Sequence, residues 1–485
     1  MSPTQILLTI LAYFAVLVGI SFLVGGSNDN DTFFKGNKSS PWYIVAFGMI
    51  GASLSGVTFI SIPGMIGSEQ FAYLQGVLGF FVGYMFIALV LIPLYYKLNV
   101  TSIYQYLEQR FGYVSYKTGA FFFLLSRVTG ASFRLFLVAL AMQYIVFKQL
   151  GVPFWLTVVI SILLIWLYTN RSGIKTIVWT DTLQTLAMLT SVGVAIYLIN
   201  ERLDWSYVEF LSSQEFASKS QIFFFDDPNA ATYFWKYFIG GIFISIAMTG
   251  LDQDMMQKNL TCKNQFEAKK NIFSMATLLV FVNFAFLSLG ALLFIYSEKY
   301  SIDIPVLAGK TRTDLLFPEI AMNQGLGSLL SVSFIIGLIA AAYSSADSAL
   351  TSLTTSFSVD FLNIEKRPEA EQKPLRKKVH VGISVLLVLV VIIFNMLDGN
   401  VVGNLFKFAT FTYGPLLGLF AFGILTKHQI KDKYAWIVAL CAMTLCILIT
   451  SLPESIIGEY KFQWEVLPLN GLLTFLGLFF IRKKA

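Results

Sequence analysis

The sequence predicts an all-α polytopic membrane protein, and three properties support this prediction. Hydrophobic residues make up 56% of the 485-residue chain, charged residues only 13%, and the mean hydropathy is +0.70; soluble domains contain about 25% charged residues. Apolar runs of about 20 residues, the length that crosses a bilayer, recur along the chain. These runs lack the alternation of a barrel strand, so they predict helices.

Thirteen such runs predict thirteen transmembrane helices. They cover residues 5–25, 42–66, 72–96, 118–147, 153–170, 177–200, 232–255, 272–297, 327–357, 379–397, 401–426, 434–451 and 466–481. The first run has no Lys or Arg before it and no small-residue cleavage site after it, so we interpret it as a retained helix rather than a signal peptide.

The distribution of Lys and Arg predicts the orientation in the membrane. If the N-terminus is outside, the inner loops contain 23 basic residues and the outer loops contain 7. Because cytoplasmic loops carry the excess of positive charge, we expect the N-terminus outside, the C-terminus in the cytoplasm, and the protein in the cell (inner) membrane. The net charge of +6 then reflects loops that face anionic lipid, and we expect no nucleic-acid partner.

The cysteines and histidines give no indication of an enzyme or a transition-metal site. Cys262, Cys441 and Cys446 show neither disulfide nor metal-ligand spacing. His380 and His428 lie at inner ends of predicted spans, where structural or solvated roles are expected. A membrane enzyme would need a nucleophile with its base, or metal ligands, inside the bilayer, so we expect no enzymatic activity.

Two predicted spans are interrupted by residues that weaken a helix. The span at 42–66 contains Gly48, Gly51, Gly56 and Pro63 among small polar residues, and such a helix can unwind in mid-membrane and expose backbone groups as ligands. A proline kink near the outer end is the alternative interpretation.

The span at 232–255 has a matching interruption at Gly250, followed by Asp252, Gln253 and Asp254. The two interrupted spans open two successive blocks of five spans. Paired interruptions of this kind predict a secondary transporter built from inverted repeats, with its binding site near the bilayer midplane.

The span at 327–357 carries a polar face. Hydroxyl and carboxylate groups recur at three- and four-residue spacing at Ser344, Asp347, Ser348, Thr351, Ser352 and Thr355. An ionisable residue inside a spanning helix indicates a functional site by default, and oxygen ligands suit a hard cation. Close helix packing through Ser and Thr is the alternative.

Two arginines share one face of the span at 118–147. Arg127 and Arg134 could bind a substrate carboxylate through their planar guanidinium groups, or they could pair with Asp181 or Asp347, and the sequence leaves both roles open. Asp181 in turn could cap a helix N-terminus or contribute to a sodium site.

The connections between spans suggest structural roles. Residues 95–112 have the pattern of a short amphipathic helix at the inner interface. The outer loop at 201–230 is long enough to cover a vestibule, and the charged loop at 363–378 suggests a solvated hinge.

Five segments, taken in chain order, resemble the sodium:solute symporter family, which includes sodium-coupled galactose, proline and sialic acid transporters. They are SGVTFISIPG at 55–64, VTSIYQYLEQRF at 100–111, KTIVWTDTLQ at 175–184, DQDMMQK at 252–258 and AAAYSSADSALTS at 340–352. The resemblance implies a LeuT-type fold in a single transporter domain that covers 1–485. Its parts would be a leading helix in 1–30, inverted five-helix repeats at 42–200 and 231–426, and two trailing helices in 434–485.

The resemblance also implies a principal sodium site. Placed by motif, its ligands are the backbone carbonyls of Gly51, Leu54 and Ala341 and the hydroxyl groups of Ser344 and Ser345.

Some family members have a second sodium site, formed by the Asp of the WTD motif and further hydroxyl groups. Asp181 and Ser348 occupy these positions here, but Asp347 stands where those members have Ser. Two carboxylates at one site could bind sodium more tightly, accept a proton, or be neutralised by Arg127, and the sequence cannot decide among these alternatives.

The family's substrate-binding positions correspond to Ser55, Thr58 and Arg127, and we also expect Gln253 in the substrate site. Sialic acid transporters also carry an arginine at about the position of Arg127. Val77 occupies a position that is polar in the sugar and sialic acid carriers, which weakens the prediction of a polyol-binding network.

We therefore expect a sodium-coupled symporter that imports a small organic solute by alternating access, with Na+ as the coupled ion. An acidic sugar or a carboxylate is slightly favoured over a neutral sugar or an amino acid. The expected partners are the solute, sodium ions and the lipid bilayer, and we expect a monomer. The alternative is a solute-sensing receptor or a channel of the same fold without coupled transport.

Overall fold

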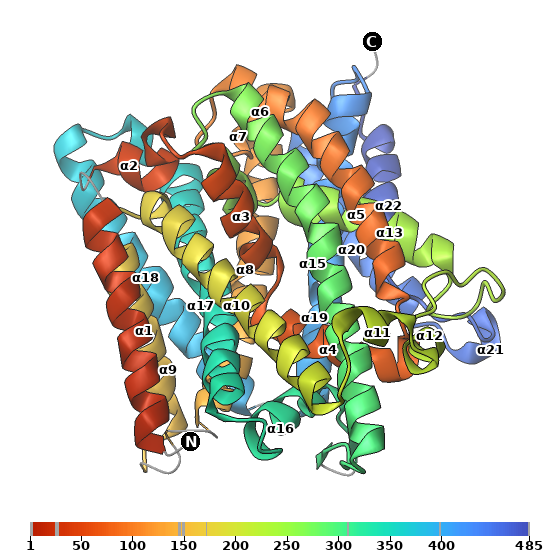
Figure 1. Ribbon diagram of the computed structural model, residues 1–485. Helices are drawn as coiled ribbons and strands as arrows, with labels where there is room; N and C mark the ends of the chain where they lie inside the picture. The colour runs from red at the N-terminus through yellow and green to blue at the C-terminus, as the bar shows by residue number, and fades with distance from the viewer. Residues whose placement is uncertain are drawn as a thin grey trace.

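The computed structural model describes residues 3–24, 29–143, 147, 151–170, 172–307, 310–396 and 399–483. These residues form a bundle of helices packed side by side (Figure 1). The one sheet among them is the short antiparallel hairpin of β1 (Val306–Leu307) and β2 (Lys310–Thr311). The prediction of an all-helical polytopic membrane protein is confirmed.

In the first half of the chain, the described residues form ten α-helices. They are α1 (Pro3–Val24), α2 (Asn30–Lys35), α3 (Trp42–Ser53), α4 (Gly56–Glu69), α5 (Tyr73–Phe86), α6 (Ile92–Leu98), α7 (Gln105–Arg110), α8 (Tyr113–Met142), α9 (Phe154–Thr169) and α10 (Ile174–Arg202). A π-helical turn at Ile87–Leu91 joins α5 to α6, so that the two form one span.

The part of the second half that the structure describes forms twelve α-helices. They are α11 (Tyr207–Ser212), α12 (Gln214–Lys219), α13 (Phe234–Ser245), α14 (Gln253–Asn259), α15 (Gln265–Lys299), α16 (Leu316–Asn323), α17 (Ser328–Ser356), α18 (Glu369–Met396), α19 (Gly399–Leu425), α20 (Ala435–Thr450), α21 (Glu454–Ile457) and α22 (Val466–Phe480).

The number of spans that the described helices support is smaller than the predicted thirteen. Nine of them are long and apolar enough to cross a membrane, and the count reaches 11 if each of two bent helix pairs is one span. The remaining two predicted spans correspond to α9 and α22, which are apolar but have only 16 and 15 residues. A straight helix needs about 20 residues to cross the hydrocarbon core.

The first interrupted span consists of α3 and α4, which meet at an angle of 56°. Leu54 and Ser55 are extended between them, and the Ser55 hydroxyl accepts a hydrogen bond from the Thr58 amide to cap the start of α4. The predicted unwinding is therefore confirmed. The proline-kink alternative is wrong, because Pro63 lies inside α4 and the chain breaks before it.

The second interrupted span consists of α13 and α14, bent by 70°. A π-helical turn at Ile246–Gly250 ends the first part, and Asp252 starts the second by accepting hydrogen bonds from the amides of Asp254 and Met255 at 2.8 and 3.2 Å. The interruption at Gly250, predicted from sequence, is confirmed.

Helix α6 and the connection from it to α8 both pack onto the break between α13 and α14. The hydroxyl groups of Tyr95 and Tyr104 donate to the carbonyls of Gly250 and Leu251 at 2.9 and 3.0 Å. The predicted amphipathic helix in this connection is limited to α7, and its neighbour Tyr104 is fully buried. The connection lies at one end of the bundle (Figure 1) and also holds the second break in place through these hydrogen bonds.

The predicted outer loop contains α11 and α12 and contacts the start of α5. The Phe71 amide donates to the carbonyl of Gln221, and the Phe224 amide donates to the side chain of Gln75. In Figure 1 this loop, α16 and α21 lie toward the lower end of the bundle, while α2 and α7 lie toward the upper end.

Candidate functional site

The polar helix α17 lies in the interior, against α10, α8 and the first interrupted span. Small residues permit this close approach. A Cβ at Gly56 would lie 3.2 Å from Cα of Ala342, and a Cβ at Gly51 would overlap the hydroxyl of Thr185 on α10. The break between α3 and α4 is thus held against α17 next to Ala341.

Two of the predicted sodium ligands, Ser344 and Ser345, lie on α17 beyond this contact, while Gly51 and Leu54 lie at the C-terminal end of α3. The last carbonyls of α3, which include that of Gly51, face a chain break and so lose the usual helical partners. On α17, the Ser344 hydroxyl donates to Asp181 Oδ1 at 2.6 Å. The Ser345 hydroxyl is buried and has no hydrogen-bond partner among the described residues. A buried hydroxyl without a partner is costly, and it is available to a cation.

Asp181 forms a buried ion pair with Lys258 of α14. The Lys258 ammonium lies 2.8 Å from Asp181 Oδ2, and both side chains are about 1% exposed. The Ser348 hydroxyl approaches the same carboxylate oxygen at 3.5 Å. Asp181 lies two turns inside α10, so the helix-cap alternative is wrong.

Sequence reasoning missed Lys258, which was counted as a basic residue of an inner loop. Lys258 follows Asp254 by four residues, so the two share one face of the helix after the predicted break. This spacing was a signal that Lys258 could point into the protein together with Asp254.

Asp347 is fully buried and is contacted by hydrogen-bond donors rather than by a cation. The Tyr168 hydroxyl of α9 donates to Asp347 Oδ2 at 2.7 Å, and the Ser348 amide donates to Oδ1 at 2.5 Å. Among the residues that the structure describes, no Lys or Arg forms an ion pair with Asp347.

Arg127 of α8 forms ion pairs with the start of α14. Its guanidinium contacts Asp254 Oδ2 through Nη2 and lies 3.8 Å from Asp252 Oδ2 through Nη1. The Tyr413 hydroxyl of α19 also donates to Asp252. Pairing of Arg127 with Asp181 or Asp347, left open by the sequence, is therefore wrong for this structure. The arginine joins α8 to the second break.

Arg134 has a different environment from Arg127. It lies two helical turns farther along the same face of α8, about 10 Å away, and it is half-buried. It forms no ion pair with any Asp or Glu in the described part of the chain. Of the two arginines that could bind a substrate carboxylate, only Arg134 has a guanidinium that is not held in an ion pair within the described part of the chain.

Gln253 has a structural role in this conformation. Its side-chain oxygen accepts from the Ile103 amide at 2.9 Å, and its side-chain nitrogen donates to the Thr101 carbonyl at 2.8 Å. Both ends of the amide are therefore used to hold the connection between α6 and α8. This geometry argues against the substrate-binding role expected for Gln253.

Ser55 and Thr58 lie together at the start of α4, where their hydroxyl oxygens are 3.0 Å apart. Ser55 is buried and Thr58 is half-buried, and the pair lies next to the break, at the start of the helix α4 that packs against α17. Val77 is buried on α5 and presents no polar group.

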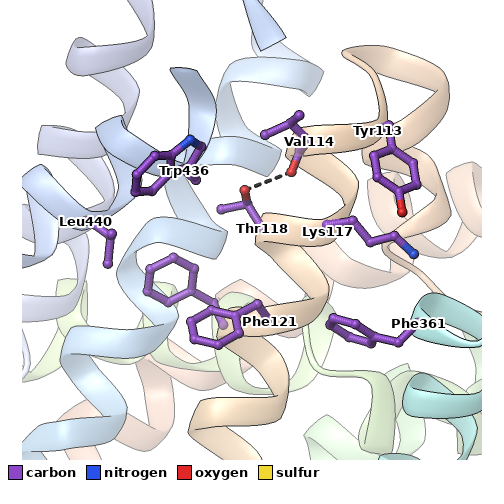
Figure 2. A pocket seen from close by; sticks show the side chains of 9 residues that line it. Tyr113, Val114, Lys117, Thr118, Phe121, Phe361, Trp436 and Leu440 are labelled. Carbon is purple, nitrogen blue, oxygen red and sulfur yellow. Dashed lines mark hydrogen bonds between the residues drawn. The ribbon is translucent and has the colours of Figure 1, made fainter. Parts of the chain in front are cut away.

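An apolar groove of about 380 Å³ lies away from these residues. Figure 2 shows its lining, which comes from the first turns of α8 with Phe361, Trp436 and Leu440. The Lys117 ammonium at its edge contacts the Asp360 carbonyl and the ring of Phe361. The groove contains none of the predicted site residues and does not contribute to the site.

Two interrupted spanning helices that meet a polar helix inside the bundle are typical of transporters that bind their cargo at helix breaks. Residues 33–430 match the Sodium:solute symporter family, and the chain belongs to this family. It is a sodium-coupled solute symporter rather than an enzyme, as the sequence predicted. Membership also favours coupled transport over the receptor or channel alternative.

Several relatives of known function are similar over most of the chain. The sodium/sialic acid symporter NanT of Aliivibrio fischeri is 26% identical over 440 residues, which cover 87% of this chain and 83% of the relative. The mouse sodium-coupled monocarboxylate transporter 1 is also 26% identical, over 85% of this chain and 67% of its own length.

Solved structures show the same fold. A Na+-coupled sialic acid symporter in a substrate-bound, outward-open state superposes with a TM-score of 0.81 at 21% identity, over 99% of both chains. Mhp1, a nucleobase-cation-symport-1 family transporter, in a closed conformation gives a TM-score of 0.58 at 16% identity over 94% of both chains.

Proposed function

We propose that this symporter imports a small organic anion, a carboxylate or an acidic sugar, by alternating access. The coupling of transport to sodium is supported mainly by one observation. The hydroxyl of Ser345 is buried on α17, beside the break between α3 and α4, and has no hydrogen-bond partner among the described residues. A sodium ion placed there would bridge the two elements. Its binding energy would then favour the conformation in which they are in contact.

The proposed sodium ligands are the carbonyls of Gly51, Leu54 and Ala341 and the hydroxyls of Ser344 and Ser345. All five are hard oxygen donors, as a sodium ion requires. Support comes from the contact of Gly56 with Ala342, which brings the break next to α17.

The proposed solute site combines Ser55 and Thr58 with an arginine of α8. The hydroxyl pair lies at the end of the break. Because Arg127 is held by Asp254 and Asp252, we propose that Arg134 contacts the solute carboxylate in this conformation. Arg127 would become available only if α14 moved away from α8. Relatives named for sialic acid and for monocarboxylates support an anionic solute.

We further propose thirteen spans arranged as two inverted repeats, residues 42–200 and 231–426, with a leading helix and two trailing helices. The breaks in α3–α4 and α13–α14 begin the two repeats. The proposed orientation has the N-terminus outside and the C-terminus in the cytoplasm. The placement of connections at alternate ends of the bundle supports this arrangement (Figure 1), and we propose that a monomer suffices for transport.

The test is uptake by the full-length protein in sealed vesicles with an inward sodium gradient. We expect accumulation of a sialic acid or a short monocarboxylate, and little accumulation of galactose or proline. The same vesicles with equal sodium on both sides provide the control. Accumulation of the neutral solutes alone would reject an anionic substrate, while uptake that ignores the sodium gradient would reject the coupling.

A further inference from the structure

The apolar groove lined by α8 and α20 runs inward from one end of the bundle. Both helices are candidate membrane spans. They start at the same end, because the Asp432 carboxylate, directly before α20, accepts hydrogen bonds from the amides of Val114 and Ser115 in the first turn of α8, each at 2.8 Å. Tyr113 and Phe121 line the groove eight residues apart, so the groove follows α8 for about 12 Å. It therefore passes from the membrane surface into the hydrocarbon region.

The deeper part of the groove is lined by apolar side chains, those of Phe121, Phe122 and Leu440. The hydroxyl beside them, that of Thr118, donates to the Val114 carbonyl at 2.8 Å within its own helix. The lining residues that the structure describes thus offer no free polar side chain to this part of the groove. The volume of about 380 Å³ lies within the range of ligand pockets. An occupant of the deeper part is therefore apolar, as a lipid chain is.

The mouth of the groove has the residues of a membrane interface. Tyr113 and Trp436 belong to the lining and are 60% and 49% exposed. Tyr and Trp concentrate at the level of the lipid headgroups. Figure 2 shows Lys117 between Tyr113 and Phe361, and its ammonium lies 4.9 and 5.4 Å from the two ring centroids. The polar mouth and the apolar depth follow the order of headgroup and tail in a lipid.

Two lysines bring positive charge to the mouth. The Lys117 ammonium donates to the Asp360 carbonyl, which leaves further N–H donors for a ligand. Lys433 is exposed, and it precedes Trp436 by three residues and Leu440 by seven, a spacing that places it on the side of α20 that lines the groove. In the part of the chain that the structure describes, neither lysine forms an ion pair with a carboxylate.

Two carboxylates near the mouth are held by donors of the protein itself. Asp432 accepts from the first turn of α8, including the Ser115 hydroxyl. Asp360 accepts from the hydroxyl groups of Tyr116 and Ser356. The ammonium of a zwitterionic headgroup would have to compete with these donors, whereas a phosphate finds two ammonium groups. The arrangement therefore favours an anionic lipid over a zwitterionic one.

We propose that this groove is a binding site for one anionic phospholipid. An acyl chain lies along Phe121 and Leu440, and the phosphate contacts the ammonium groups of Lys117 and Lys433. Basic pockets between spanning helices bind headgroups of this kind. The lining comes from α8, from α20 and from the turn after α17 that contains Phe361, so the bound lipid connects these three elements. The site is separate from the proposed sodium and solute sites.

Tryptophan fluorescence of the full-length protein in vesicles tests the site. The vesicles contain phosphatidylcholine and a small fraction of phosphatidylglycerol with brominated acyl chains, because bromine quenches a tryptophan that it contacts. We expect stronger quenching than the same fraction of brominated phosphatidylcholine produces. Trp436→Phe should remove this difference, because Trp436 is the tryptophan that lines the groove.

Removal of the two lysine charges should weaken the binding. We expect Lys117→Gln combined with Lys433→Gln to raise the fraction of phosphatidylglycerol needed for half-maximal quenching about ten-fold. Lys377→Gln combined with Lys378→Gln is the matched control, because these exposed lysines of α18 are not part of the lining. If the first double variant does not fold, Lys433→Gln alone should give a shift of about three-fold.

Three results would overturn the proposal. Equal quenching by the two brominated lipids would show that the groove does not select an anionic headgroup. An unchanged dependence on phosphatidylglycerol in the lysine variants would remove Lys117 and Lys433 from the site. If soluble glycerol phosphate abolished the quenching difference at the concentration of the lipid, the acyl chain would contribute nothing and the ligand would be a free phosphate.

Discussion

Lys258 and Asp181 form an ion pair of 2.8 Å between α14 and α10, inside the bundle. The pair links the second interrupted span to the helix that packs against the first one. Because both groups are withdrawn from water, the stability of the pair depends on keeping both partners. Removal of either partner leaves the other charge buried without compensation.

The first prediction concerns this pair. We expect Lys258→Met to lower the free energy of unfolding by about 3–5 kcal/mol, because Asp181 would then be a buried charge without its cation. Thermal unfolding in detergent would measure the loss. Addition of Asp181→Asn to Lys258→Met should recover part of the stability. Additive losses in this double-mutant cycle would mean that the two side chains are not coupled.

The second prediction concerns the sodium ligand. Ser345→Ala removes a buried hydroxyl that has no protein partner, so folding should be little affected while sodium binding weakens about ten-fold, roughly 1.4 kcal/mol. The concentration of sodium at half-maximal uptake measures the change. Ser333→Ala on the same helix is the matched control, because that hydroxyl donates to the Leu330 carbonyl within its own helix. Equal sodium dependence in the two variants would remove Ser345 from the site.

Local patterns predicted the two interrupted spans and the polar helix correctly. Gly51, Ser55 and Gly56 weaken a helix wherever it lies, and a carboxylate in an apolar run is unusual in any fold. An interruption of this span followed from these properties, but its position at Leu54 and Ser55, before Pro63, required the structure.

The partners of the charged residues could not be predicted in the same way. Arg127 could reach several acids, and only the packing of α14 against the interior brings Asp254 to it. Lys258 follows a break in the chain, and whether it enters the protein or the cytoplasm depends on the angle between α13 and α14. Gln253 was expected in the solute site, but both ends of its side-chain amide form hydrogen bonds with the backbone of Thr101 and Ile103.

The third prediction concerns the contact of α3 with α10. A Cβ at Gly51 would overlap the Thr185 hydroxyl, so we expect Gly51→Ala to lower the free energy of unfolding by about 1–3 kcal/mol. Thr185→Ala in the same protein should relieve most of the clash. Gly19→Ala on α1 is the control, because nothing lies within 4 Å of the added methyl group. If the Gly51→Ala protein had the same free energy of unfolding as the Gly19→Ala protein, the close approach of α3 to α10 would be contradicted.

The fourth prediction concerns pH and the thiol of Cys262, in the connection after α14. Burial raises the pKa of this thiol to about 12, from an ordinary value near 9. The folded state thus holds this proton more tightly than the unfolded state does, so the thiol's contribution to stability is lost as the pH rises from about 9 to 12. Maleimide labelling of Cys262 at pH 8 should be slow in the folded protein and fast after unfolding. Rapid labelling of the folded protein would show that the thiol is accessible.

The fifth prediction separates the two arginines of α8. Arg134→Lys keeps the charge but loses the planar pair of donors, so we expect the KM for a carboxylate solute to rise about ten-fold or more. Arg127→Lys instead weakens the ion pairs with Asp254 and Asp252, so it should lower thermal stability and the rate of transport more than it raises KM. Uptake of one anionic solute by both variants, measured beside their unfolding temperatures, distinguishes the roles. If Arg127→Lys alone raised KM, the carboxylate ligand would be Arg127, and α14 would have to release it before the solute binds.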